Sequence, residues 1–370
     1  MIGTFFHPGP TEVRPEILGA MSRRMIPHRG AEMRELLARV HPRLQSLFGT
    51  RQPVYVATCA ATAMMEAGIR CGARRRVLAL VSGAFGERFA QVAERCGREV
   101  SRLRTPAGEV VTAEQVAVAL EHGEYDAVTA VQVETSTGAL TDIASIGRLM
   151  RELPDTLLLV DGVSSVGGME VAMDACGVDL LFSGSQKALA LPPGLAFAAC
   201  SNRMLERARS LPGRGLYLDL VRYDEFWQKG ETSTTPAVSL CFALDAQLEA
   251  IEQEGLDARF RRHAAMQAAV ERWVAHARSR GLTVDFLAAK SIRAPTVSCL
   301  TYEGDARRIV AGVRERGVVI GGGYGELAQS TFRIGHMGDH TVDEVGRVLS
   351  LVEDVLADEA RAATTGGSLD

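Results

Sequence analysis

Short apolar runs alternate with helical patterns between about residues 53 and 200. The apolar runs have the length of buried strands, and the segments between them repeat apolar residues at three- and four-residue spacing. We expect strands at Pro53–Thr58, Arg76–Val81, Ala127–Val133, Thr156–Val160, Leu180–Ser183 and Ala196–Cys200. We expect helices at Phe85–Cys96, Ala113–Glu121 and Ile143–Leu153. This alternation predicts an α/β fold with a doubly wound, mainly parallel sheet, in which ligands bind at the carboxyl ends of the strands.

The rest of the chain predicts a smaller second domain of α+β type. A long amphipathic stretch from about 237 to 280 indicates two helices separated near Gly255. Further strands are expected at Thr296–Tyr302, Val318–Ile320 and Thr331–Ile334, and further helices at Ala306–Arg316 and Val342–Glu359. We therefore divide the chain into an N-terminal segment (1–15), a large domain (16–250), a small C-terminal domain (251–361) and a disordered tail (362–370).

Composition and charge exclude several classes of function. The 370 residues are 46% hydrophobic and 23% charged, as in an ordinary globular protein, and the net charge of −4 gives no sign of a nucleic-acid partner. Seven cysteines without a CxxC pair argue against a disulfide framework or a zinc site and favour a reducing compartment. We see no signal peptide and no apolar run long enough to span a bilayer. We expect a cytoplasmic protein with no membrane partner.

Two residues at strand ends are candidates for catalysis. Asp161 follows the apolar run Leu157–Val160, and Lys187 follows the next predicted strand 26 positions later. Lys187 is one of only three lysines, with Lys229 and Lys290, and its neighbours are small or apolar. Alone, Asp161 could cap a loop and Lys187 could be solvated. Together they suit pyridoxal phosphate, whose aldehyde forms a Schiff base with a lysine and whose pyridine nitrogen stays protonated beside a carboxylate.

Several motifs in the same order resemble the class V aminotransferases of fold type I. Asp161-Gly162-Val163 and Ser183-Gly184-Ser185-Gln186-Lys187 carry the resemblance most strongly. It extends over nearly the whole chain, from His7-Pro8-Gly9-Pro10-Thr11 through His28-Arg29-Gly30 to Phe332-Arg333-Ile334-Gly335. Within the family, the sequence is similar to the alanine:glyoxylate and serine:glyoxylate (or serine:pyruvate) aminotransferases. The resemblance implies two half-reactions, in which Lys187 moves the α-proton of the amino acid and Asp161 stabilises the protonated ring.

The resemblance also implies a set of binding residues. The turn Ala60-Ala61-Thr62 matches the family's phosphate-binding turn, and backbone N–H groups at a helix N-terminus bind anions. Arg333 matches the arginine that binds the substrate carboxylate, and the segment around Gly9 matches one that closes over the substrate. The other implied cofactor contacts are Phe85 and Val163 on the two ring faces, Ser136 at the phenolic oxygen, Gln186 beside the phosphate or that oxygen, and Thr234 at the phosphate of the partner subunit in a homodimer.

The sequence leaves the substrates open. One carboxylate-binding arginine favours a small donor, alanine or serine, and the resemblance favours glyoxylate or pyruvate as acceptor. Aspartate and 2-aminoethylphosphonate remain alternatives, as does a lyase of the cysteine desulfurase type, although Cys299 lies in a predicted strand and Phe85 replaces the usual histidine. The run Gly321–Gly325 is expected to form a loop near the mouth of the site. We expect no metal site, since Gly338 interrupts the cluster of His336, Asp339 and His340.

Overall fold

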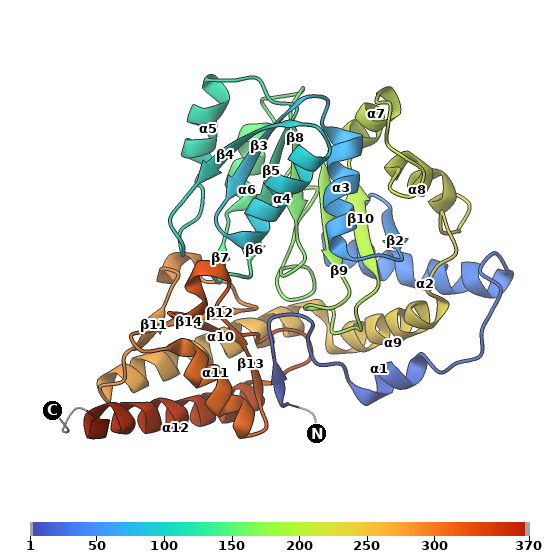
Figure 1. Cartoon of the computed structure of the whole chain (residues 1–370). Helices are drawn as coiled ribbons and strands as arrows, with labels where there is room; N and C mark the ends of the chain where they lie inside the picture. Colours follow the sequence, from blue (N-terminus) through green and yellow to red (C-terminus); the bar gives the residue numbers. More distant parts are fainter. Residues whose placement is uncertain (1–2, 367–370) are drawn as a thin grey trace.

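A computed structural model describes residues 3–366 and contains two main sheets (Figure 1). The larger sheet has seven strands, and only β10 runs antiparallel to its neighbours. In spatial order its strands are β2 (Val54–Ala57), β10 (Ala196–Cys200), β9 (Leu180–Gly184), β8 (Leu157–Asp161), β5 (Ala127–Val131), β3 (Arg76–Val81) and β4 (Glu99–Arg104). The expected α/β fold with a mainly parallel sheet is therefore confirmed.

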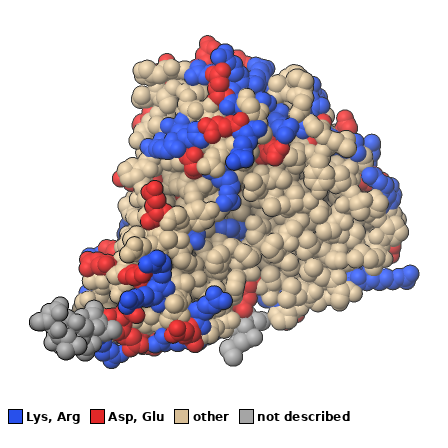
Figure 2. Space-filling model, in the orientation of Figure 1, with Lys and Arg blue, Asp and Glu red and all other residues tan. Residues whose placement is uncertain are grey.

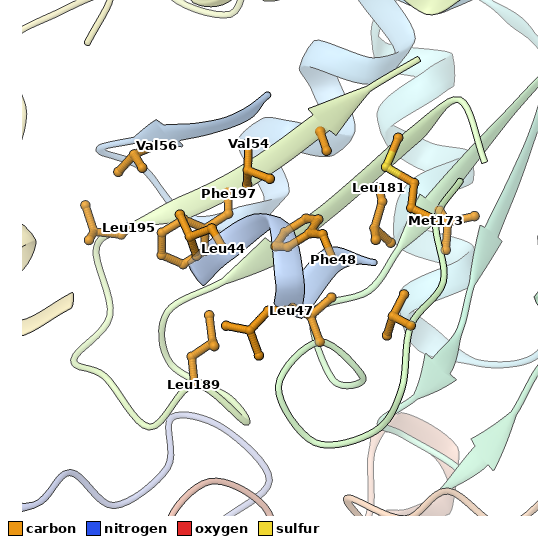
Figure 3. Packing of buried hydrophobic residues seen from close by; sticks show 14 of the residues in the cluster. Leu44, Leu47, Phe48, Val54, Val56, Met173, Leu181, Leu189, Leu195 and Phe197 are labelled. Atoms are coloured by element: carbon orange, nitrogen blue, oxygen red, sulfur yellow. The ribbon is translucent and has the colours of Figure 1, made fainter. Parts of the chain in front are cut away.

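Helices cover both faces of the large sheet, as its apolar strands require. One face packs against α2 (Ala31–Phe48), α5 (Ala113–Glu121), α6 (Ile143–Met150) and α9 (Val238–Glu254). The other packs against α3 (Ala61–Gly72), α4 (Ala84–Arg95), α7 (Asn202–Ser210) and α8 (Leu220–Trp227). Figure 3 shows Leu44 and Phe48 of α2 packed near Phe197 of β10. This burial fixes the strand ends from which the site is built.

The smaller sheet has five strands and includes the N-terminal segment. Its order is β1 (Phe5–Phe6), β13 (Val319–Gly322), β14 (Thr331–Ile334), β12 (Ser298–Tyr302) and β11 (Val284–Phe286). The helices α10 (Leu256–Ser279), α11 (Ala306–Glu315) and α12 (Val342–Gly366) pack around it, as Figure 1 shows. Strand β1 runs parallel to β13, so the first residues are joined to the last domain. The remaining regular elements are α1 (Pro15–Ala20), the β6–β7 pair (Val133–Glu134, Ala139–Leu140) and the 3-10 turns Lys290–Ile292 and Gly325–Ala328.

The chain passes from one domain to the other at Gly255. Helix α9 packs in the core of the large domain and α10 in that of the small domain, so the predicted boundary after residue 250 falls inside α9. The disordered tail predicted for 362–370 overlaps the end of α12 as far as Gly366, and 367–370 lie outside the described residues. Among the described helices, none has both the length and the apolar composition needed to cross a bilayer.

A buried arginine ties these parts together. Arg259 of α10 is 1% exposed, and its guanidinium pairs with Glu254 (2.9 Å) and Asp339 (3.0 Å). It also donates to the carbonyl oxygens of Gly167 (2.8 Å) and Ala188 (2.7 Å). Glu254 ends α9 and Asp339 lies in the small domain. One side chain therefore connects both domains to the residue that follows Lys187.

We expect Arg259→Met to lower the free energy of unfolding by about 3 kcal/mol, because two buried carbonyl groups lose this donor and two carboxylates lose one of their partners. Urea unfolding of the holoenzyme measures this change. Arg261→Met is the matched control, since Arg261 is exposed on the same helix. Equal unfolding midpoints for the two variants would show that the buried arginine contributes nothing specific.

Candidate active site

Asp161 and Lys187 meet at one edge of the large sheet. Asp161 is the last residue of β8, and Lys187 follows the end of β9 by three residues. The two strands are parallel neighbours, with Asp161 opposite Phe182, so both side chains reach the carboxyl edge. They line one pocket, together with Ala60, Ala61, Thr62, Met65, Phe85, Arg88, Val131, Val133, Thr135, Val163, Ser164 and Gln186.

Burial determines the chemistry of the lysine. Lys187 is 6% exposed, and its Nζ donates to the Pro8 carbonyl (2.6 Å) and to Oγ1 of Thr135 (3.1 Å). Loss of water around the amine lowers its pKa to about 7, against the opposing attraction of Asp161, and the charge of Arg333 adds to the lowering. A substantial fraction of the amine is therefore neutral near pH 7 and able to attack a carbonyl carbon.

Burial also governs Asp161. The loss of water raises the pKa of this carboxyl to about 7, although Oδ1 accepts a hydrogen bond from the Val163 N–H (2.8 Å). A positive charge placed beside it would favour the ionised form. A protonated pyridine nitrogen supplies such a charge, so this carboxyl suits the ring of pyridoxal phosphate.

The other end of the pocket suits a phosphate. Helix α3 begins at Ala61, and its N-cap residue, Ala60, has no side chain that could accept from the first N–H groups. These N–H groups and the helix dipole favour an anion, and Thr62 adds a hydroxyl. Gln186 lines the same pocket. The buried amine, the buried carboxyl and this helix end together fit pyridoxal phosphate.

A buried carboxylate, that of Glu134, binds the start of the helix that carries Phe85. Glu134 is 0% exposed and accepts hydrogen bonds from the N–H groups of Phe85 and Gly86, both at 3.1 Å. It thereby fixes the start of α4 and the position of the Phe85 ring, whose centroid lies 5.4 Å from Nζ of Lys187. Val163 also lines the pocket, and the placement of Phe85 and Val163 on the two faces of the cofactor ring stays a prediction.

The structure places Thr135, and not Ser136, beside Lys187. Ser136 donates its hydroxyl to Glu134 and accepts from the Ala84 N–H (3.0 Å), so it belongs to the support of α4. Thr135 Oγ1 lies 3.1 Å from Nζ of Lys187 and 2.6 Å from the Ser164 hydroxyl. Thr135 therefore supplies the hydroxyl that contacts the lysine, because the buried Glu134 carboxylate takes the serine. The assignment of Ser136 to the phenolic oxygen of the cofactor stays a prediction.

The N-terminal segment lies directly against Lys187. Gly9 has φ +115°, and a Cβ on it would lie 2.5 Å from Cε of the lysine, so only glycine fits there. Thr11 donates its N–H to the Gln186 carbonyl (2.9 Å) and its hydroxyl to the Lys187 carbonyl (3.0 Å). This segment therefore covers the lysine, and its closure over the substrate stays a prediction.

Arg333 lies close to the lysine, whereas Thr234 does not line the pocket. Arg333 of β14 is 7% exposed and donates to the carbonyl oxygens of Gly322 (2.8 Å) and Thr135 (3.2 Å), so it borders the lysine from the small domain. Burial lowers its pKa, and the guanidinium keeps its charge. Thr234 does not line the pocket of its own chain. Met65, Arg88, Thr135 and Ser164 line it although the sequence analysis did not select them.

Comparison with known proteins agrees with this geometry. The family model for class-V aminotransferases matches residues 16–345. An uncharacterized aminotransferase of Methanocaldococcus jannaschii is 36% identical over 354 residues, which are 94% of this chain and 90% of that protein. An L-aspartate–glyoxylate aminotransferase of Paracoccus denitrificans is 32% identical over 369 residues, with 95% and 91% covered. The crystal structure of an alanine–glyoxylate aminotransferase from Nostoc sp. has a TM-score of 0.89 at 32% identity, with 95% of both chains covered.

We expect Lys187 of the cofactor-free protein to react with formaldehyde and borohydride with a half-maximal rate near pH 7. The amine must be neutral to react, and burial lowers its pKa to about that value. Mass spectrometry of peptides across a pH series measures the modification of each lysine. The exposed Lys229 and Lys290 give reference profiles within the same sample.

Asp161→Asn should move the Lys187 profile to still lower pH, because the carboxylate opposes the lowering of the pKa. A Lys187 profile that coincides with those of the two exposed lysines would contradict the assignment of a buried, reactive amine.

Proposed function

The chain belongs to the class V aminotransferases and depends on pyridoxal phosphate, and we propose that it moves an amino group from a small L-amino acid, alanine or serine, to glyoxylate or pyruvate. The observation that carries this proposal is that Lys187 and Asp161 line one pocket, while Arg333 is bonded to the carbonyl of Thr135, which also lines it. An amine, a carboxyl group and a carboxylate-binding guanidinium are the three groups that an amino acid and this cofactor require.

The pocket would hold the cofactor along its length. When bound, pyridoxal phosphate supplies an aldehyde that bonds to amines and a ring that draws electrons from the substrate's α-carbon. The first turn of α3, with Ala61 and Thr62, would bind the phosphate. Phe85 and Val163 would enclose the ring, and Asp161 would hold the proton on its nitrogen.

The chain's own residues would transfer the proton, orient the substrate and exclude water. Nζ of Lys187 would take the proton from the substrate α-carbon and hold it for return during the transfer, so Lys187 would serve as both base and acid. Arg333 orients the substrate by its carboxylate, since a planar guanidinium can form two parallel hydrogen bonds with it. The Pro8–Gly9 segment lies over the lysine and keeps water away from the reacting atoms.

A lyase reaction of the desulfurase type is less well supported by the same structure. That reaction needs a cysteine thiolate on a loop that reaches the substrate. Cys299 is 1% exposed within β12, and burial raises the pKa of its thiol to about 11. The second domain therefore offers no reactive thiol among the described residues, since the other cysteines precede residue 242.

We expect alanine to discharge the yellow holoenzyme and to release one pyruvate per active site when no oxo acid is present. Glyoxylate should then restore the absorbance and yield glycine. Absorbance spectra recorded after mixing with alanine, together with quantification of the released pyruvate, measure the first half-reaction. Lys187→Ala is the control and should release no pyruvate, since it lacks the proton carrier. A yellow enzyme that is unaffected by both alanine and serine would rule out the proposed donors.

We further propose a homodimer that shares its active sites, and a cytoplasmic location. Much of the right half of the face in Figure 2 is free of charged side chains, over the region of α3, β2 and α9 in Figure 1. Leu216 and Tyr217, on a loop beside the phosphate turn, are 69% and 44% exposed. Tyr217 donates to the Thr58 carbonyl (2.7 Å), which links this loop to the turn.

The seven free cysteines support the proposed cytoplasmic location, because thiols stay unpaired in a reducing compartment.

In such a dimer, Thr234→Ala should weaken pyridoxal phosphate binding about tenfold, because one hydrogen bond to a charged phosphate is lost. Fluorescence titration of the apo-protein measures the dissociation constant, and sedimentation equilibrium measures the association state. Thr235→Ala is the matched control at an exposed neighbouring position. A monomeric wild-type protein, or equal affinities for the two variants, would contradict a phosphate site completed by the partner.

A further inference from the structure

A second arginine faces the pocket beside the carboxylate-binding one. Arg88 lies on α4, one helical turn after Phe85, and lines the same pocket as Lys187 and Asp161. Its guanidinium carbon lies 4.8 Å from the centroid of the Phe85 ring, and Nη2 donates to the Tyr324 hydroxyl (3.0 Å). A ring and a hydroxyl thus hold the guanidinium at the mouth of the pocket.

Among the described residues, no carboxylate forms an ion pair with this arginine, although its charge still acts on Asp161 from a distance. Within residues 3–361, no ion pair of 4 Å or less includes Arg88. Glu87, its neighbour on the helix, pairs instead with Arg102 (3.2 Å) and Arg104 (2.6 Å) of β4. Arg88 is half-buried, so its charge is only partly solvated. An uncompensated guanidinium that lines a substrate pocket is a binding group for an anion.

Tyr324 connects the two arginines. Its hydroxyl accepts from Arg88, and its ring centroid lies 5.8 Å from the guanidinium carbon of Arg333. Tyr324 itself is 39% exposed and lies after the end of β13. The loop predicted for Gly321–Gly325 is wrong in its first part, since Gly321 and Gly322 pair with β14 within β13. Arg88 therefore stands on the substrate side of the pocket. The α-carboxylate of an amino acid engages only Arg333, which leaves Arg88 for a second anionic group.

Building on the proposed function, we propose that Arg88 is a specificity-determining residue that binds the side-chain carboxylate of a dicarboxylic amino donor. The enzyme then uses donors such as aspartate in addition to small neutral ones. Stacking on Phe85 fixes the plane of the guanidinium, and Tyr324 leaves at least one edge of it free for a carboxylate. Arg333 and Arg88 would hold the two carboxylates, while the amine remains on the Lys187 side.

The reaction balances without a further reactant. The C–N bond at the α-carbon of aspartate breaks, and this carbon becomes the ketone of oxaloacetate. The nitrogen forms a new C–N bond with the carbonyl carbon of glyoxylate, which becomes glycine. The two electrons lost by the donor carbon are gained by the acceptor carbon. The ketone oxygen of oxaloacetate comes from water in the first half-reaction, and the aldehyde oxygen of glyoxylate leaves as water in the second, so no net water is used. Lys187 would remove a proton from the α-carbon of the donor in the first half-reaction and place one on the α-carbon of glycine in the second.

The test compares kcat/KM for aspartate, asparagine and alanine, each with glyoxylate as acceptor. Asparagine has nearly the shape of aspartate without its side-chain charge. We expect the wild-type enzyme to prefer aspartate to asparagine. In Arg88→Gln, the ratio of kcat/KM for aspartate to that for alanine should fall about 10- to 100-fold, because a charge-assisted hydrogen-bonded pair is lost.

Arg95→Gln is the matched control, since it removes the same charge from an exposed position on the same helix. It should leave the aspartate-to-alanine ratio at the wild-type value. Arg88→Lys, which retains the charge but not the planar fork, should give an intermediate ratio.

The outcomes separate this inference from the proposed function. If the wild-type enzyme transaminates alanine or serine but not aspartate, the role of Arg88 is refuted and the aminotransferase function stands. If Arg88→Gln lowers kcat/KM for all three donors by the same factor, Arg88 acts only as a positioning residue and the inference is overturned. If no donor reacts with the yellow enzyme, the proposed donors and acceptors themselves fail.

Discussion

The burial of one lysine amine beside one carboxyl group is the constraint around which this molecule is arranged. In the unfolded chain, Lys187 is an ordinary protonated lysine. In the folded protein the loss of water lowers its pKa to about 7. Between these two values the unfolded state binds one more proton than the folded state, so burial of the amine costs stability at neutral pH and the cost shrinks as the pH rises. The surrounding structure must supply this free energy.

The contacts around Lys187 show how it is supplied. The carbonyl groups of Lys187 and Ala188 are held by Thr11 and Arg259, which come from the N-terminal segment and from α10. Strand β1 pairs with β13, so the Pro8 carbonyl that accepts from Nζ is carried by the small-domain sheet. The lysine belongs to the large domain, but its environment is completed by segments from both ends of the chain. The position of the small domain and the reactivity of the amine are therefore coupled.

Sequence alone could predict the parts of the site that depend on local pattern. The strands ending near Asp161 and Lys187 are continuous apolar runs, so their position and their shared edge follow from the order of elements.

Strand β4 was not predicted, because it is an edge strand whose residues are mostly polar and only partly buried. The pairing of β1 with β13 joins residues more than 300 positions apart, which no local pattern reveals. Which hydroxyl of this turn contacts Lys187 also depends on a distant contact, since Glu134 binds the N–H groups at the start of α4 and the Ser136 hydroxyl. Arg88 had a local signal, one helical turn after Phe85, but its value as a binding group depends on the absence of a carboxylate that only the fold can show.

The same electrostatics links substrate binding to proton transfer. The charges of Arg333 and Arg88 both lower the pKa of Lys187, and so they favour a neutral, nucleophilic amine. A carboxylate bound to Arg333 neutralises part of this positive field and raises the affinity of the amine for a proton. The free amine is thus a good nucleophile toward the cofactor's aldehyde, and it becomes a stronger base once a substrate carboxylate is in place. A substrate with two carboxylates neutralises both arginines and strengthens this change. Recognition of the substrate charge and activation of the proton carrier therefore share one physical cause.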